Sequence, residues 1–141
     1  MLGKLLLTID AVGLLLGAPL ADYNHTHIFN PRWPPHAKFH CAQTINLSVT
    51  LGLATLYYTW RSSFLPKSLP PSIARQREQD SLRTALFTGT IYWIAGLASI
   101  LYPGTAWVDP EFDPSGLPPQ VPIFVGFGSA ALLGWMLDRQ G

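Results

Sequence analysis

The chain has 141 residues, of which 48% are hydrophobic and only 12% are charged, and its formal net charge is +1. Soluble domains carry about 25% charged residues, so this composition favours a membrane protein. The small net charge provides no basic surface for nucleic acid, and we expect no nucleic-acid partner. The single cysteine, Cys41, excludes an intramolecular disulfide.

Four apolar segments approach the length of about 20 residues that a helix needs to cross a bilayer. They cover residues 2–21, 42–60, 82–102 and 119–137, and proline-containing connections separate them. We therefore expect an all-α fold: a single domain over residues 1–141 that forms an integral membrane antiparallel four-helix bundle.

The first segment carries an acidic residue, Asp10, near its middle. This segment could be a signal peptide cleaved after Ala21, but a carboxylate inside the apolar run and the nearby Pro19 favour a retained span. A carboxylate at this depth should face the other helices rather than lipid. Asp10 is thus either a candidate catalytic acid or a structural hydrogen-bonding group.

Lys and Arg are concentrated at the two termini and in the connection 61–83. Because cytosolic connections of membrane proteins are enriched in these residues, we expect both termini in the cytosol. The connection that follows the first segment and the acidic loop 109–113 then lie on the opposite side. The expected location is the membrane of the endoplasmic reticulum.

All the histidines of the chain lie in the connection that follows the first segment. They are His25, His27, His36 and His40, and Asp22 precedes them. Ionisable groups next to hydrocarbon are costly to keep and usually mark a functional site. We expect this connection, together with the loop 109–113, to close over one end of the bundle and to enclose a cavity.

A helix that starts after Pro35 would place His36, His40 and Gln43 on one face, with Asn46 beside it. Such a polar stripe should turn into the bundle rather than toward lipid.

His36 and His40 are therefore the predicted proton carriers, and Asp22 would orient one of them. His25, His27 and Asp10 are further catalytic candidates.

Candidate substrate-binding residues are polar or aromatic side chains of the same region. They are Asn24, Asn30, Arg32, Trp33, Gln43 and Asn46. Arg32, with Asn24 or Asn30, would hold negative charge that develops on a substrate. Asn24 also begins an N-glycosylation sequon, although the crowded surroundings favour an unmodified side chain.

The histidines have two other interpretations. His25 with His27, and His36 with His40, could bind a metal ion together with Asp22, but their spacing matches no established metal motif. They could also cap helix ends and bond to loop carbonyls. We expect no bound metal and no other cofactor.

Residues 22–40, with the sequence DYNHTHIFNPRWPPHAKFH, resemble a family of small four-span membrane proteins of fungi that are often encoded beside enzymes of secondary metabolism. The resemblance implies membership of such a pathway rather than a particular reaction. In architecture alone, the chain is similar to the emopamil-binding sterol isomerases, which move a double bond in a lipophilic pocket.

These observations predict a membrane enzyme of secondary-metabolite biosynthesis that isomerises or cyclises a lipophilic terpenoid or polyketide intermediate by acid–base chemistry. Its partners would be that small molecule, the lipid bilayer and other enzymes of the pathway. A non-catalytic accessory or carrier protein of such a pathway is the alternative, and a metal-dependent membrane oxidase is the third possibility.

Overall fold

The computed structural model describes residues 1–64, 66, 68–112, 115–116 and 118–139, and within them it contains helices and no strand. The four long helices are α1 (Leu2–Asp22), α2 (Pro35–Trp60), α3 (Pro71–Ala98) and α4 (Gln120–Asp138). Short 3-10 helices, η1 (Arg61–Phe64), η2 (Ser99–Leu101) and η3 (Pro110–Phe112), lie in the connections. The predicted all-helical fold is confirmed for the described part of the chain.

Three helical segments are long and apolar enough to cross a membrane: Leu2–Asp22, Pro71–Leu101 and Gln120–Asp138. Helix α2 is not among them, so only three of the four predicted apolar spans meet this criterion. The reason is its composition, because hydroxyl, amide and imidazole side chains recur along its whole length. The three apolar helices indicate a membrane protein.

Two helices begin well before the apolar segments that predicted them. Helix α2 starts at Pro35 and α3 at Pro71, each with proline in the first turn. Proline is favoured there because the first helical N–H groups have no acceptor within the helix. The polar start of each helix therefore extends beyond its apolar part.

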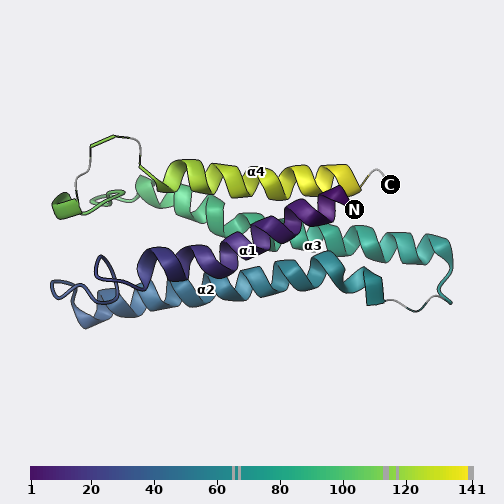
Figure 1. Cartoon of the computed structure of the whole chain (residues 1–141), viewed down its shortest axis with the longest axis horizontal. Coiled ribbons are helices and arrows are strands. Elements are labelled where there is room, and N and C mark those ends of the chain that lie inside the picture. The colour runs from purple at the N-terminus through teal and green to yellow at the C-terminus, as the bar shows by residue number, and fades with distance from the viewer. Residues whose placement is uncertain (65, 67, 113–114, 117, 140–141) are drawn as a thin grey trace.

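The helices pack so that α1 contacts α2 and α4, while α3 contacts the same two helices from the other side. In Figure 1 the start of α1 and the end of α4 lie toward the right, on the side where the end of α2 and the start of α3 also lie. The connections from α1 to α2 and from α3 to α4 lie together at the opposite end. The histidine-bearing segment is therefore next to the acidic loop.

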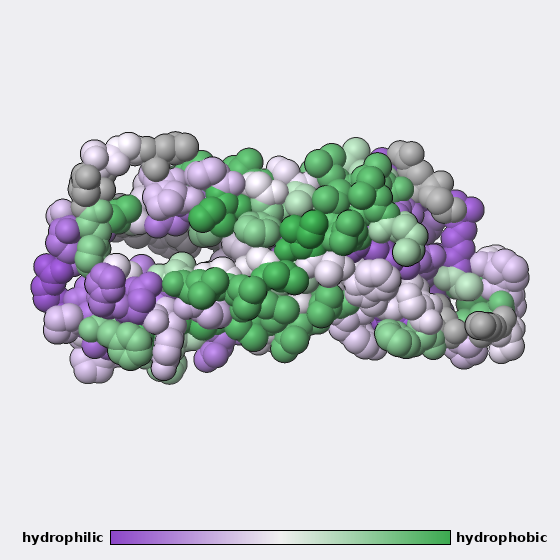
Figure 2. Space-filling model, in the orientation of Figure 1, coloured by the Kyte–Doolittle hydropathy of each residue, from purple (hydrophilic) through white to green (hydrophobic). Residues whose placement is uncertain are grey.

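Helix α1 has two distinct faces. Leu7 and Leu14 are fully buried, whereas Leu5, Ile9 and Leu16 are about half exposed. Apolar side chains likewise cover the middle of the molecule in Figure 2, while polar residues gather at its two ends. This distribution is typical of a helix bundle surrounded by lipid.

Small residues allow close helix contacts at particular points. A Cβ atom on Gly134 of α4 would lie 2.7 Å from the carbonyl oxygen of Gly3 in α1. A Cβ atom on Gly89 of α3 would overlap the carboxylate of Asp10. Glycine therefore brings α4 against α1, and α3 against the one buried acid of α1.

Candidate functional site

The connection that follows α1 is fixed by a chain of side-chain hydrogen bonds. The Asn24 amide nitrogen donates to the carbonyl oxygen of Ala21 at 2.7 Å. The Thr26 hydroxyl donates to Oδ1 of Asn24 at 2.6 Å, and its oxygen lies 2.7 Å from Nδ1 of His27. The end of α1 is thereby linked directly to the His27 ring.

This chain determines which nitrogen of His27 carries a proton. Because the Asn24 amide nitrogen bonds to a carbonyl, Oδ1 of Asn24 must be the acceptor for the Thr26 hydroxyl. The Thr26 oxygen then has only lone pairs to offer to His27, so Nδ1 of His27 is the donor. Nε2 is left as the nitrogen that can accept or release a proton.

Nε2 of His27 lies 3.7 Å from Oδ1 of Asp22, the last residue of α1. Both side chains line two neighbouring cavities. We call the first the aromatic cavity, with a volume of about 520 Å³, and the second the aliphatic cavity, with a volume of about 590 Å³. Both volumes are within the range of small-molecule binding sites.

The cavities share part of their walls and differ in the rest. Asp22, His27, Tyr92, Gln120 and Phe124 line both. Trp107 is also common to both, the aromatic cavity is completed by Trp33, Trp93 and Phe112, and side chains such as Leu47, Leu51, Phe87 and Ile91 complete the aliphatic one. An opening between the upper and lower parts of the molecule is visible at this end in Figure 2.

Two contacts hold the acidic loop against the histidine-bearing segment. The Trp33 indole donates to Oδ2 of Asp109 at 3.3 Å, and the Arg32 guanidinium pairs with Glu111. The expectation that the two loops close over the same end is confirmed for these residues. Asp113, also in the acidic loop, lies outside the described residues.

Asn30 has a structural role in the same segment. Its side chain is 1% exposed, and its Oδ1 accepts a hydrogen bond from the backbone nitrogen of Arg32 at 2.9 Å. The Arg32 guanidinium points to Glu111 and does not line either cavity. Of the predicted substrate-binding residues, the cavities include only Trp33 in their walls.

The prediction that the polar stripe of α2 faces the bundle interior is wrong. His36, His40, Gln43 and Asn46 are all exposed. The His36 and His40 rings contact each other, with 3.1 Å between their Nε2 atoms, and Nδ1 of His40 lies 3.3 Å from Oε1 of Gln43. Neither histidine lines a cavity.

The physical reason is that buried positions of α2 are taken by small side chains. Ser48, Thr55 and Thr59 are fully buried, and the Ser48 hydroxyl donates to the carbonyl oxygen of Leu14 at 2.7 Å. Close packing of α1 on α2 leaves no room there for an imidazole. His25 is exposed as well, and its ring contacts Phe112.

Asp10 is fully buried and faces the other helices, as the sequence predicted. Its Oδ1 accepts a hydrogen bond from the Trp93 indole at 2.7 Å, whereas its Oδ2 has no partner among the described residues. Asp10 lines neither the aromatic nor the aliphatic cavity. It contacts the site through Trp93, which forms part of the aromatic wall.

Tyr92, Trp107, Gln120 and Phe124 line the cavities but were not among the predicted site residues. Tyr92 and Phe124 look like ordinary interior aromatics of apolar helices, and Trp107 looks like an interfacial aromatic. The one local signal is Gln120, an amide at the start of an apolar helix, and its Nε2 donates to the carbonyl oxygen of Trp107 at 2.9 Å.

No group of three or more His, Cys, Asp or Glu side chains in the described part of the chain is arranged to hold a metal ion. Asp22 and His27 are a pair of titratable side chains that lines both the aromatic and the aliphatic cavity. This arrangement supports proton transfer within pockets whose walls are mostly apolar.

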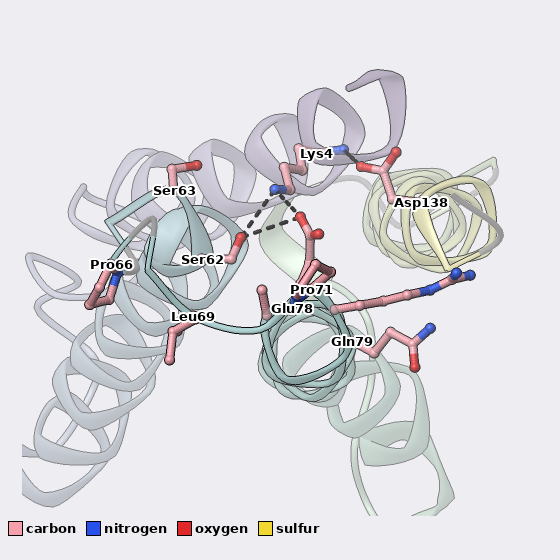
Figure 3. Close-up of a pocket in the computed structure, with 11 residues that line it drawn as sticks. Lys4, Ser62, Ser63, Pro66, Leu69, Pro71, Glu78, Gln79 and Asp138 are labelled. Atoms are coloured by element: carbon pink, nitrogen blue, oxygen red, sulfur yellow. Dashed lines mark hydrogen bonds and ion pairs between the residues drawn. The ribbon is translucent and has the colours of Figure 1, made fainter.

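A third cavity, of about 540 Å³, lies at the opposite end of the bundle and is shown in Figure 3. Its lysine is already paired: the Lys4 ammonium contacts Glu78 at 2.5 Å and Ser62 at 3.2 Å. Asp138 accepts the backbone N–H of Lys4 at 2.7 Å. These contacts tie together the ends of the helices, and they leave the pair at Asp22 and His27 as the better catalytic candidate.

Comparison with known proteins gives one match. No curated protein and no solved structure matches the chain. Residues 6–140 match a family of unknown function, DUF6640. Since the match extends over nearly all of the chain, the protein belongs to the DUF6640 family.

Proposed function

We propose that the protein is a membrane enzyme that isomerises or cyclises a lipophilic intermediate by moving a proton. The observation that carries this proposal is the Asp22 and His27 pair, which faces two cavities lined mainly by apolar side chains. A terpenoid or polyketide skeleton fits such a wall, because it is apolar and carries few functional groups. The resemblance of residues 22–40 to proteins of fungal secondary metabolism supports this choice of substrate.

The pair replaces His36 and His40 as the proposed proton carriers. When Asp22 and His27 share one proton, one of them is an acid and the other is a base. The acid gives its proton to one carbon of a double bond, whose π electrons form the new C–H bond and leave positive charge on the neighbouring carbon. The base then takes a proton from an adjacent carbon, and the electrons of that C–H bond form the new double bond.

In a cyclisation, the same positive carbon is attacked by a second double bond of the substrate before the proton is lost. One proton enters and one leaves in either reaction, so no oxidant or reductant is needed. The cavity walls would hold the skeleton in a folded shape that favours one product.

In the membrane, we propose an antiparallel bundle in which α2 crosses with the three apolar helices. Its polar residues near the histidines would lie at the surface of the bilayer, and its buried hydroxyl groups bond to other helices or to backbone carbonyls. The excess of Lys and Arg at one end supports cytosolic termini. The proposed membrane is that of the endoplasmic reticulum.

The test compares single variants in cells that make the pathway product. His27→Gln and Asp22→Asn are expected to abolish the product while the protein remains at wild-type abundance in the membrane. His36→Ala and His40→Ala are the matched controls, since both imidazoles are exposed outside the cavities, and they are expected to leave product formation unchanged.

Unchanged product in the His27→Gln and Asp22→Asn variants would contradict the proposal. It would favour the alternative, a non-catalytic accessory or carrier protein. Loss of product only with His36→Ala or His40→Ala would indicate that the proton carriers are the exposed histidines of α2.

A further inference from the structure

Aromatic rings form a large part of the wall of the aromatic cavity. Its wall contains Trp33, Tyr92, Trp93, Trp107, Phe112 and Phe124. Several of these rings meet edge to face rather than stacking: Tyr92 and Trp93 lie 5.2 Å apart at 87°, and Tyr92 and Phe124 lie 6.3 Å apart at 74°. Rings at such angles surround a volume from different directions.

The faces of aromatic rings carry partial negative charge and attract a cation that lies over them within about 6 Å. This attraction grows as the surroundings become less polar, and most of the cavity wall is apolar. Tryptophan gives the largest effect of the natural side chains, and three of the six rings are tryptophans.

The charged residues of the site also favour a bound cation over an anion. Asp109 lines the aromatic cavity, and the Asp22 and His27 pair, neutral while it shares one proton, is left with a net negative charge once it has given that proton to the substrate. Neither the aromatic nor the aliphatic cavity has a Lys or Arg among its described lining residues. The nearest guanidinium on the histidine-bearing segment, that of Arg32, is paired with Glu111 and is exposed. The field in the aromatic cavity therefore favours positive charge and disfavours anions.

We infer that the aromatic cavity binds an apolar skeleton that bears positive charge, and that it stabilises the carbocation formed when the Asp22 and His27 pair protonates a double bond. This inference rests on the proposed function and specifies its intermediate. Protonation adds a proton to one alkene carbon and leaves the charge on the next carbon, while loss of a neighbouring proton restores neutrality. A stable ammonium of the same shape would mimic that intermediate.

The test is a binding measurement that requires no turnover. The full-length protein, purified in a neutral detergent, is titrated with decyltrimethylammonium and with decyl sulfate, and binding is followed by tryptophan fluorescence. We expect the cation to bind at least about tenfold more tightly than the anion with the same chain. Equal affinity for the two probes, or tighter binding of the anion, would overturn the inference.

Variants test whether Trp107, a ring on the wall that both cavities share, takes part in binding the cation. Trp107→Leu is expected to reduce the preference for the cation at least about threefold, whereas Trp107→Phe retains a ring and should restore most of it. Phe39→Leu is the matched control, because Phe39 is an exposed aromatic residue at the same end of the molecule and lines neither cavity. Equal losses in Trp107→Leu and Phe39→Leu would mean nonspecific binding of the cation.

The result can be separated from the test of the proposed function. Suppose that the preference for the cation depends on Trp107 but the Asp22→Asn variant still forms product. The binding site would then be supported, and the proposed reaction would be contradicted. Suppose instead that Asp22→Asn abolishes the product but the protein shows no preference for the cation. The proton transfer would then be supported, and stabilisation of a carbocation by the aromatic cavity would be contradicted.

Discussion

The indole nitrogen of Trp93 in α3 donates a hydrogen bond to Oδ1 of Asp10 in α1, with 2.7 Å between the two atoms. Asp10 is fully buried and Trp93 is 2% exposed. The Trp93 ring also packs against Phe127 and Phe124 of α4, with ring centres 5.3 and 5.5 Å apart. One buried acid in α1 thus fixes a residue that forms part of the cavity wall.

Replacing Asp10 by Leu should destabilise the protein. The buried Trp93 indole would lose its acceptor, at a cost of about 1–3 kcal/mol. The measurement is unfolding by sodium dodecyl sulfate in mixed micelles. In a Trp93→Phe background, the Asp10→Leu substitution should cost less, because no donor remains; an equal cost in both backgrounds would contradict the role of this bond.

Replacing Gly89 by Ala should force α1 and α3 apart. The added methyl group would overlap the Asp10 carboxylate, and crowding of this kind costs about 1–3 kcal/mol. Gly126→Ala in α4 is the matched control, since a Cβ atom there would meet nothing within 4 Å. Thermal unfolding in detergent should show a lower midpoint for Gly89→Ala alone, and equal midpoints would exclude a tight contact at Gly89.

Replacing Asn24 by Ala should impair catalysis although Asp22 and His27 both remain in the cavity wall. The Thr26 hydroxyl would lose its acceptor and become free to donate to Nδ1 of His27, which would favour the wrong tautomer. We expect product formation to fall at least about tenfold. Asn24→Asp retains an acceptor for Thr26 and should keep more activity; equal activity of the two variants would contradict this role.

Asn30→Ala should cost more stability than Arg32→Ala. The first leaves the backbone N–H of Arg32 without its buried acceptor, at about 1–3 kcal/mol. The second breaks an ion pair in which the Arg32 side chain is 62% exposed, and such pairs contribute about 0–1 kcal/mol. The midpoints of detergent-solubilised protein measure both effects, and the reverse order would show that the loops are held mainly by the ion pair.

The helical fold could be predicted because a long apolar run is a strong local signal, and α1 and α4 closely follow their runs. Helix α2 was harder to predict. A polar stripe at helical spacing on α2 shows that His36 and His40 share a face, but it does not show which direction that face takes. Packing decides that, and the small residues Ser48 and Gly52 fill the contact with α1.

The site was only partly predictable for a similar reason. Asp22 and His27 belong to one short segment, so their proximity follows from local sequence. Tyr92, Trp107 and Gln120 join them from distant parts of the chain, and apolar helices carry no local mark of which aromatic ring will line a cavity. Only the three-dimensional arrangement separates these rings from lipid-facing ones.

The amino group of Met1 lies 3.0 Å from a carboxylate oxygen of Asp138, near the other terminus. The start of α1 and the end of α4 are therefore neighbours in space, and a short linker could join them into a circular chain. New termini opened in the connection between α2 and α3 would lie at that same end of the bundle. Such a permuted protein would show whether the order in which the helices are made matters for assembly.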